Sequence, residues 1–186
     1  METRPSFVIQ QKPDSKSLTD FYCGVEEMDD FIHHNLDNDI TNRHCTLYTV
    51  QNMDGVIVAM FALSFDSLVL CEDDFEDMEY GLGAPNFQSS EHKEQFLHQL
   101  RYPAMDIAYF AVRKEYQFQK YGKNIIREII KYIKEQTLGG CQFLTVDAYD
   151  TVKHSAVRFY ERCEFVRAER QNPSPNTIRM YYAIQY

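Results

Sequence analysis

The feature that most limits the fold of this 186-residue chain is a pattern of strand, turn and helix between residues 107 and 140. The run Ile107–Val112 (IAYFAV) is almost wholly apolar, which is typical of a strand covered on both faces of its sheet. The residues after the turn predict a helix that Gly139-Gly140 ends, with one apolar face made by Ile125, Ile126, Ile129, Ile130 and Ile133. A strand, a turn and a helix N-terminus in this order make an anion site, because backbone N–H groups and the helix dipole face the turn.

The turn itself is poor in glycine. Residues 113–121 and the helix start contain neither GxGxxG nor GxxxxGK[ST], so chemistry on nucleoside triphosphates is disfavoured. Only Gly122 is present, although close approach of a backbone to phosphate usually selects glycine. Lys120 and Lys123 each offer an ammonium group that could reach a phosphate. The sequence thus predicts an anion site that relies partly on side chains.

The distribution of charge supports a discrete site. The net charge of −9 argues against a general nucleic-acid binder, because phosphate backbones require clustered Lys and Arg. Six of the eight residues at 72–79 are acidic, whereas residues 113–134 carry a local balance of +5. The basic segment is either the site of one anionic ligand or a solvated lysine-rich helix face. Charge alone does not separate these two interpretations.

The remaining pattern predicts a single α+β domain over residues 1–186. Asp54-Gly55 indicates a hairpin, residues 71–91 predict a long acidic surface loop, and residues 171–176 predict a turn. A helix from about Glu91 to Arg101 is expected to turn Phe96, Leu97 and Leu100 inward. Further helices are expected near 28–36 and 155–162, and strands at 6–11, 44–50, 56–70, 107–112, 141–148, 165–170 and 177–184.

The sequence disfavours a membrane span, a secretory signal, disulfide bonds and a metal site. The apolar runs are shorter than a membrane span, and the first residues lack the core of a signal peptide. Five widely spaced cysteines without a CxxC pair predict free thiols in a reducing cytoplasm. The six histidines show no metal-ligand spacing, so no metal is expected. We therefore predict a cytoplasmic protein without a membrane partner.

The central pattern also resembles a known family. Residues 107–126 are similar to motif A of the GNAT superfamily of N-acetyltransferases, an apolar strand followed by [Q/R]-x-x-G-x-[G/A] and a helix. Gln117 matches the first position of that motif and Gly122 the last, while Lys120 stands at the middle glycine. Ser155–Phe165 resembles the family's A-x-x-x-Y-E-x-x-G-F segment through Ala156, Tyr160, Glu161 and Phe165, with Glu164 in place of the glycine.

The N-terminal part narrows the resemblance. Residues 21–32 (FYCGVEEMDDFI) look like the F-x-C-G-x-x-x-L-D-x-F-L start of a GNAT branch that includes acetyltransferase toxins of toxin–antitoxin pairs. The resemblance covers most of residues 7–70 and 101–170 and leaves the segment at about 71–91 as an insertion. It implies a GNAT (acyl-CoA N-acyltransferase) fold, with a mixed, mostly antiparallel sheet of six to seven strands flanked by helices.

The resemblance also implies a binding site for acetyl-CoA as co-substrate. In the family, the turn binds the pyrophosphate through backbone amides, and the end of the preceding strand pairs with the pantetheine arm and polarises the carbonyl. The implied cofactor-binding residues are Phe110, Ala111, Val112, Gln117, Phe118, Gln119, Lys120, Tyr121, Gly122, Lys123 and Ser155. Tyr160 matches the tyrosine that protonates or hydrogen-bonds the leaving sulfur. Without the motif, Tyr160 would read as a packed helix aromatic.

The general base stays open at the level of sequence. Asp106, Glu115, Asp147 and His154 are plausible by position, and each could equally be a solvated or hydrogen-bonded surface residue. A chain of water molecules is a further alternative.

The predicted function is transfer of acetyl from acetyl-CoA to a primary amine of a small molecule, peptide or aminoacyl group, in a ternary complex. The alternatives are a degenerate GNAT module that binds CoA or a protein partner without catalysis, motivated by Lys120 and Glu164, and a toxin-type enzyme acting on aminoacyl-tRNA. The net charge disfavours any other nucleic acid. An antitoxin or a second copy of the chain is the candidate protein partner.

Overall fold

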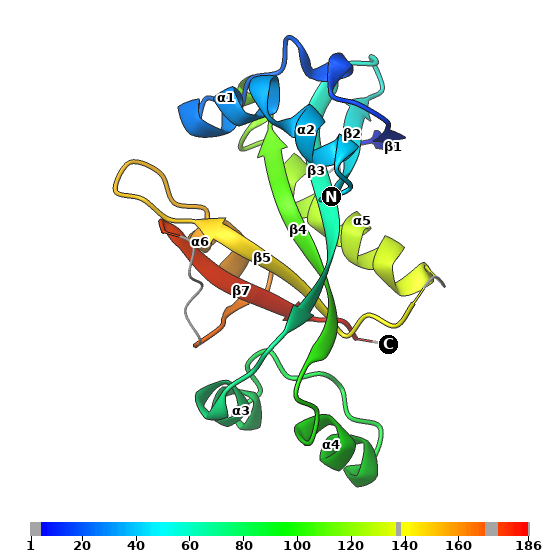
Figure 1. Ribbon diagram of the computed structural model, residues 1–186, viewed down its shortest axis with the longest axis vertical. Helices are drawn as coiled ribbons and strands as arrows, with labels where there is room; N and C mark the ends of the chain where they lie inside the picture. Colours follow the sequence, from blue (N-terminus) through cyan, green and yellow to red (C-terminus); the bar gives the residue numbers. More distant parts are fainter. Residues whose placement is uncertain (1–4, 137–138, 170–174, 186) are drawn as a thin grey trace. The chain divides into compact units, whose positions relative to one another are not determined.

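Seven strands form one mixed sheet in the computed structural model, which describes residues 5–136, 139–169 and 175–185 (Figure 1). The strand order is β1-β2-β3-β4-β5-β7-β6. The strands are β1 (Phe7–Lys12), β2 (Thr46–Asn52), β3 (Ile57–Leu68), β4 (Tyr102–Val112), β5 (Phe143–Tyr149), β6 (Val166–Arg167) and β7 (Thr177–Ala183). The predicted sheet of six to seven strands is therefore confirmed.

The helices are α1 (Glu26–His34), α2 (Leu36–Thr41), α3 (Glu72–Glu79), α4 (Ser90–Leu97), α5 (Tyr121–Glu135) and α6 (Val157–Glu161), with 3-10 turns at Lys16–Leu18 and Lys114–Tyr116. The chain separates into two compact units: residues 1–64 with 107–129, and residues 65–106 with 130–186. We call them unit 1 and unit 2. β3, β4 and α5 each contribute residues to both units. The single domain over residues 1–186 stays a prediction.

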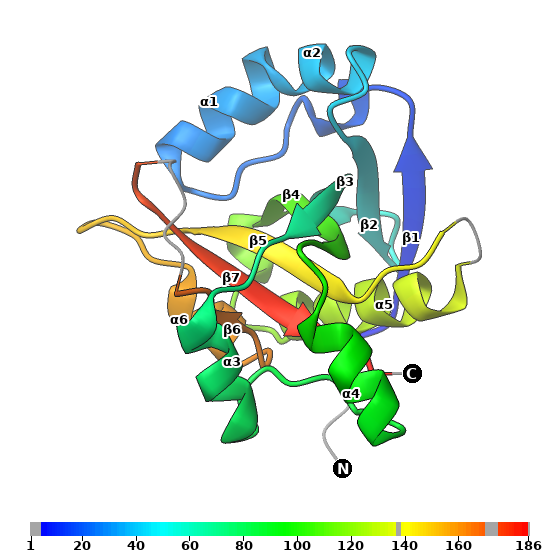
Figure 2. The same ribbon diagram turned by 60° about the horizontal axis from the view of Figure 1, so that its bottom comes forward.

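Unit 1 has its core between two short helices and the strands. The apolar faces of α1 and α2 pack on β2, β3 and β4 through buried residues such as Ile32, Leu36, Leu47 and Met60. Figures 1 and 2 show α5 on the other side of these strands from α1 and α2. The predicted helix face is confirmed by Ile125, Ile126, Ile129 and Ile133, which are at most 1% exposed.

The predicted hairpin joins β2 to β3. Gly55 has a φ of +79°, and the amide of Asn52 donates to the carbonyl of Val56 at 3.0 Å. The side-chain oxygen of Asn52 accepts from the amides of Asp54 and Val56. Asp-Gly suits such a turn because glycine adopts positive φ without a steric penalty.

Unit 2 is built around β5 and β7, which pair antiparallel over seven residue pairs. Tyr102, Phe143 and Tyr181 lie in its apolar core. The parallel ladder between β4 and β5 is short and runs from Ala104–Phe143 to Asp106–Thr145. β4 continues beyond that last pair to Val112, and β5 continues to Tyr149. Asp106 and Thr145 therefore stand where the parallel pairing ends.

The predicted acidic loop at 71–91 is wrong for its first part, because Glu72–Glu79 form helix α3. The carboxylate of Asp74 is buried, accepting from the amide of Cys71 at 2.8 Å and from the amide of Glu169 at 3.0 Å. Phe75 and Met78 belong to the core of unit 2. Acidic residues in the first turn favour the helix dipole, and the charge run concealed these two apolar positions.

The second part of that segment is fixed by packing. Gly83 has a φ of +66°, and a Cβ there would lie 2.6 Å from Val166 and 2.8 Å from Tyr181. Helix α4 ends at Leu97, before the predicted end near Arg101. Phe96 is buried, which confirms its predicted inward position. Leu97 and Leu100 are exposed, so the inward positions predicted for them are wrong. β4 begins at Tyr102, five residues before the predicted strand, because Tyr102 is buried and its hydroxyl donates to the carbonyl of Phe96. Of the predicted turn at 171–176, only residues 175–176 are among those described.

Candidate active site

The turn after β4 is held by the side chain of Gln117. Its Nε2 atom donates to the carbonyl of Cys23 at 2.7 Å and to the carbonyl of Val112 at 3.0 Å. Both acceptors belong to unit 1, and one of them is the last residue of β4. The first residue of the predicted motif therefore ties the turn to the strand that precedes it and to the N-terminal segment.

Two residues of this turn have left-handed backbone conformations. Phe118 has a φ of 61° and Lys120 a φ of 66°, and the side chain of Phe118 is fully exposed. A left-handed conformation costs an L-residue about 1–2 kcal/mol relative to glycine. Lys120 thus adopts a backbone conformation that suits glycine, at the position where motif A carries glycine.

Helix α5 begins at Tyr121, the residue before Gly122. Tyr121 is buried and contacts Tyr116 edge to face, with ring centroids 5.8 Å apart. Asn124 closes the first turn, because its Nδ2 atom donates to the carbonyl of Lys120 at 3.0 Å. The first amides of a helix have no acceptor within it, so Tyr121, Gly122 and Lys123 lie where an α5 N-terminus attracts anions.

The basic segment is only partly available to a ligand. The guanidinium of Arg113 donates to the carbonyls of Ile57 and Asp20 and lies over the ring of Phe21, at 5.4 Å from its centroid. Lys123, Arg127, Lys131 and Lys134 are exposed on α5. At the end of β4, Ala111 is buried, and Phe110 and Val112 are half-buried. Gln119 donates to the carbonyl of Glu115 at 2.7 Å.

Tyr160 lies in unit 2, in the last turn of α6. Its side chain is 4% exposed and contacts the rings of Phe159 and Phe165. Burial raises the pKa of Tyr160 well above its ordinary value, and the charges of Asp106 and Cys163 raise it further. The phenol is therefore neutral throughout the physiological range and can donate a hydrogen bond.

At the end of α6, as in the turn of unit 1, a residue other than glycine has a left-handed backbone conformation where the resembling motif carries glycine. Glu164 has a φ of 71°, and the amide of Phe165 donates a hydrogen bond to the carbonyl of Tyr160 at 3.1 Å. This is the helix end at which the resembling motif carries glycine. Ser155 lies before the helix and pairs with Asp150 through a backbone bridge, and its hydroxyl accepts from the amide of Val157 at 3.4 Å.

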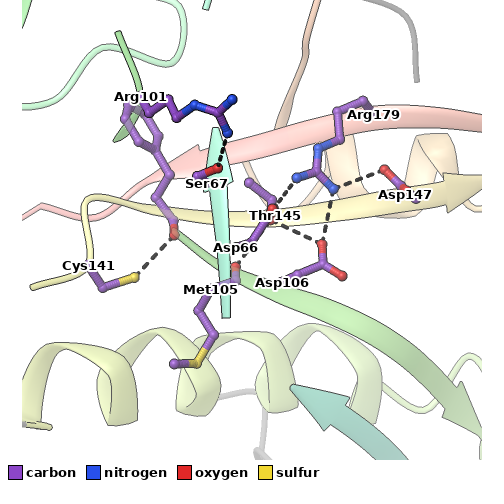
Figure 3. Close-up of polar contacts among 10 residues, drawn as sticks. Asp66, Ser67, Arg101, Met105, Asp106, Cys141, Thr145, Asp147 and Arg179 are labelled. Atoms are coloured by element: carbon purple, nitrogen blue, oxygen red, sulfur yellow. Dashed lines mark hydrogen bonds and ion pairs between the residues drawn. The ribbon is translucent and has the colours of Figure 1, made fainter. Parts of the chain in front are cut away.

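Unit 2 also contains a cluster that sequence motifs do not reveal, in which Arg179 of β7 contacts three aspartates (Figure 3). Its Nη1 atom lies 3.2 Å from Asp106 of β4 and 3.0 Å from Asp147 of β5. Its Nη2 atom pairs with Asp66 of β3. The hydroxyl of Thr145 lies 2.7 Å from Asp66 Oδ2 and 3.0 Å from Asp106 Oδ1. We call these five residues the Arg179 cluster.

The carboxylates of this cluster differ in their affinity for a proton. Burial raises the pKa of Asp106 to about 6, with Arg179 opposing the shift and Asp66 and Asp147 adding to it. Burial would also raise the pKa of Asp66, but hydrogen bonding to Thr145 and the charge of Arg179 outweigh burial, so that pKa is lowered. The three carboxylates in turn raise the pKa of Arg179, although burial lowers it. Asp106 is thus the member that exchanges a proton near neutral pH.

The structure sorts the four predicted base candidates. It brings Asp106 and Asp147 together through Arg179, whereas Glu115 lies in a 3-10 turn of unit 1 and His154 in the turn after β5. Sequence reasoning missed Asp66, Thr145 and Arg179. The signal available was the position of Asp66 and Arg179, each a charged residue within a strand that is otherwise largely apolar.

Comparison with known proteins decides the family. The model of the acetyltransferase (GNAT) family matches residues 15–165, which is most of the chain. The chain belongs to this family. It is therefore a GNAT-type acetyltransferase, and acetyl-CoA is its co-substrate. The turn at Gln117–Lys123 fits that ligand in kind, because a helix N-terminus and lysine side chains suit a pyrophosphate.

Solved structures show the same fold. A bacterial toxin has a TM-score of 0.70 at 17% identity, covering 97% of this chain and 92% of its own. A mutant of KacT has 0.67 at 18% identity, covering 96% and 95%. AtaT complexed with acetyl-methionyl-tRNAfMet has 0.64 at 16% identity, covering 94% of both chains. No protein of curated function matches the sequence.

Three further observations concern the described residues. No helix in ranges 5–136, 139–169 and 175–185 is long and apolar enough to cross a membrane. Within the same ranges, no group of three His, Cys, Asp or Glu side chains could hold a metal ion. All five cysteines are free thiols, and four of them are buried. Burial raises the pKa of Cys23 to about 12 and that of Cys45 to about 11, which leaves both as unreactive thiols.

Proposed function

We propose that the turn from Gln117 to Lys123 holds the pyrophosphate of acetyl-CoA and that Tyr160 assists departure of the thiolate when a primary amine attacks the acetyl group. The observation that carries the binding part is the left-handed turn, which Gln117 ties to β4 at the N-terminus of α5. Bound acetyl-CoA supplies the activated thioester. We assign the pantetheine arm to the end of β4, at Phe110, Ala111 and Val112. Ser155 is the remaining residue assigned to cofactor binding.

The environment of Tyr160 favours one of its two predicted roles. A thiol has a pKa of about 8.5, whereas the pKa of Tyr160 is raised above the ordinary 10 of a phenol. The proton therefore stays on the phenol, and Tyr160 stabilises the developing thiolate by a charge-assisted hydrogen bond. Protonation of the sulfur is then left to solvent.

The test has two stages. Titration calorimetry with CoA measures binding, and release of free CoA thiol from acetyl-CoA over a panel of small-molecule and peptide amines measures transfer. Binding with turnover supports the proposal. Absence of CoA binding would contradict the assignment of the turn, and binding without turnover on any amine would support the degenerate module.

An aminoacyl-tRNA is the second candidate acceptor. The observation that favours it is the likeness to AtaT complexed with acetyl-methionyl-tRNAfMet over 94% of both chains. An α-amino group has a pKa of about 8, so a useful fraction of an aminoacyl ester is already a neutral nucleophile at physiological pH. The net charge of −9 counts against a large RNA interface unless the exposed lysines and Arg127 of α5 supply one.

A direct assay separates the two acceptors. Transfer of labelled acetyl to charged tRNA, compared with uncharged tRNA and with free amino acid esters, measures the preference. Growth arrest on expression, relieved by co-expression of a neighbouring gene product, would support an antitoxin partner, as AtaT has in AtaR. The proposal places the reaction in the cytoplasm, and the five free thiols support that location.

A further inference from the structure

The Arg179 cluster contains a group that the proposed function does not use. Asp66, Asp106, Asp147 and Arg179 come from four strands and meet within unit 2 (Figure 3). Three carboxylates surround one guanidinium, so the cluster carries an excess of negative charge. A purely structural ion pair would need only one carboxylate, because each further buried carboxylate adds a desolvation cost.

Hydrogen-bond accounting shows that Asp106 can hold a proton. The hydroxyl of Thr145 has one hydrogen but three acceptors within reach, namely Asp66 at 2.7 Å, Asp106 at 3.0 Å and the carbonyl of Met105 at 3.3 Å. Donation to the nearest, Asp66, leaves the Thr145 oxygen as an acceptor facing Asp106. Oδ1 of Asp106 also accepts from Nη1 of Arg179 at 3.2 Å. A protonated Asp106 can therefore donate from Oδ1 to Thr145, which donates on to Asp66, while Arg179 stays in contact with the same oxygen.

The position of Asp106 places this proton acceptor near the proposed chemistry. It is the last residue of β4 in the parallel ladder with β5, and 18% of its side chain is exposed, which lets a proton leave to solvent. It also lies close enough to Tyr160 for its charge to raise the pKa of that phenol. The groups that face it are Asp66 of β3, Thr145 and Asp147 of β5, Tyr160 of α6 and Arg179 of β7.

We propose that Asp106 is the general base of the acetyl transfer and accepts the proton that the ammonium form of the acceptor must lose before attack. This inference rests on the proposed function, because it assigns Asp106 to the reaction in which Tyr160 takes part. The step is balanced. Asp106 takes one proton from the ammonium, the neutral nitrogen forms the C–N bond, and the C–S bond breaks with its electron pair on sulfur. The second nitrogen proton is lost as the amide forms and one proton reaches the thiolate, while Asp106 returns its proton to solvent.

The assignment predicts the substrate class more closely. A base of this kind is needed for amines that bind as ammonium ions, and the excess negative charge of the cluster favours such cations. A neutral or weakly basic amine would gain little from it. The structure thus points to a cationic acceptor amine.

The test is the pH dependence of kcat with saturating acetyl-CoA and acceptor. In the wild type we expect kcat to fall below about pH 6, as Asp106 becomes protonated. Asp106→Asn should lower kcat by about 100-fold or more and abolish the acid limb of the pH profile, which is the fall of kcat below about pH 6. CoA affinity, measured by calorimetry, should stay unchanged. Asp73→Asn, the same substitution at an exposed position of α3, should leave both unchanged. A limb that persists unchanged in Asp106→Asn, with wild-type kcat, would overturn the inference.

A second variant keeps the test independent of the folding of Asp106→Asn. Asp147→Asn removes a charge that raises the pKa of Asp106 and releases Arg179 Nη1 to Asp106, so the acid limb should move to lower pH. An unmoved limb, or one moved to higher pH, would contradict the assignment. Failure of the wild type to transfer acetyl to any amine would instead contradict the proposed function itself.

Discussion

The turn of unit 1 and the Arg179 cluster of unit 2 are built in opposite ways. The turn is made of consecutive residues, acts through backbone conformation and a helix N-terminus, and is tied to β4 by the side chain of Gln117. The cluster takes one or two residues from each of four strands and acts through side-chain charge. A backbone site tolerates substitution as long as its dihedral angles are kept, whereas in a charge cluster the effect depends on which charge is removed. Substitutions in the two regions should therefore differ in size.

The largest effect is expected for Arg179→Leu. Removing one member of a buried ion cluster leaves carboxylates without a counter-charge, which costs about 3–5 kcal/mol of unfolding free energy. Chemical denaturation at pH 7 measures it. The matched control is Arg167→Leu, which removes an exposed pair with Glu161 at 2.8 Å and should cost under about 1 kcal/mol. Equal losses in the two variants would contradict the difference between the regions.

Tyr160→Phe should lower kcat by about 100-fold, the usual order for loss of a group that assists in the transition state. The ring keeps its contacts with Phe159 and Phe165, so the melting temperature and CoA affinity should change little. Steady-state kinetics and calorimetry measure these quantities, with Tyr80→Phe on the exposed surface as control. Unchanged kcat would make Tyr160 a packed aromatic only.

Asp106→Asn should increase stability at pH 7 while it removes activity. A carboxyl pKa of about 6 in the folded protein lies above the unfolded value near 3.9, so the folded state binds more protons and its stability falls as pH rises between about 4 and 6. Asparagine removes that loss, which is about 2–3 kcal/mol at pH 7. Denaturation curves from pH 4 to 8 test this, and the gain should vanish toward pH 4. A variant less stable than the wild type at pH 7 would show that the carboxylate is structural.

Gln117→Ala should weaken CoA binding and cost about 1–2 kcal/mol of stability, because the carbonyls of Cys23 and Val112 lose their shared donor. Calorimetry and denaturation measure the two effects. Gln95→Ala removes a single exposed hydrogen bond to Glu91 on α4, outside the proposed site, and serves as control. Equal effects of the two substitutions would remove Gln117 as the residue that fixes the turn.

The smallest effects are expected at the two left-handed positions where the resembling motifs carry glycine. Lys120→Gly and Glu164→Gly should each change stability by no more than about +1 kcal/mol, because relief of strain is partly offset by the entropy of glycine. Only the lysine belongs to the proposed anion site, so CoA affinity should fall in Lys120→Ala and stay unchanged in Glu164→Gly. A gain of CoA affinity in Lys120→Gly would show that the lysine crowds the backbone.

The sequence alone determined what depends on neighbours along the chain. The strand–turn–helix unit could be predicted from the apolar strand, Gln117, Gly122 and the isoleucine face of α5. The hairpin could be predicted from Asp54-Gly55. In both cases the spacing of residues along the chain is the physical cause of the structure. The same local logic led to the resemblance and to the family that comparison then confirmed. It failed at α3, where six carboxylates suggested solvent although Asp74, Phe75 and Met78 face inward.

Only the tertiary structure decided the contents of the Arg179 cluster. Asp66, Asp106, Asp147 and Arg179 span 113 positions of the chain, and no local pattern joins them. Strand order and register bring them together, since Asp106 pairs with Thr145 and Asp147 with Arg179. The pKa of Asp106 follows from that burial and those charges, which exist only in the folded chain. The sequence could name Asp106 as one of four candidates, and the sheet supplied the burial and charges that support its proposed role as the base.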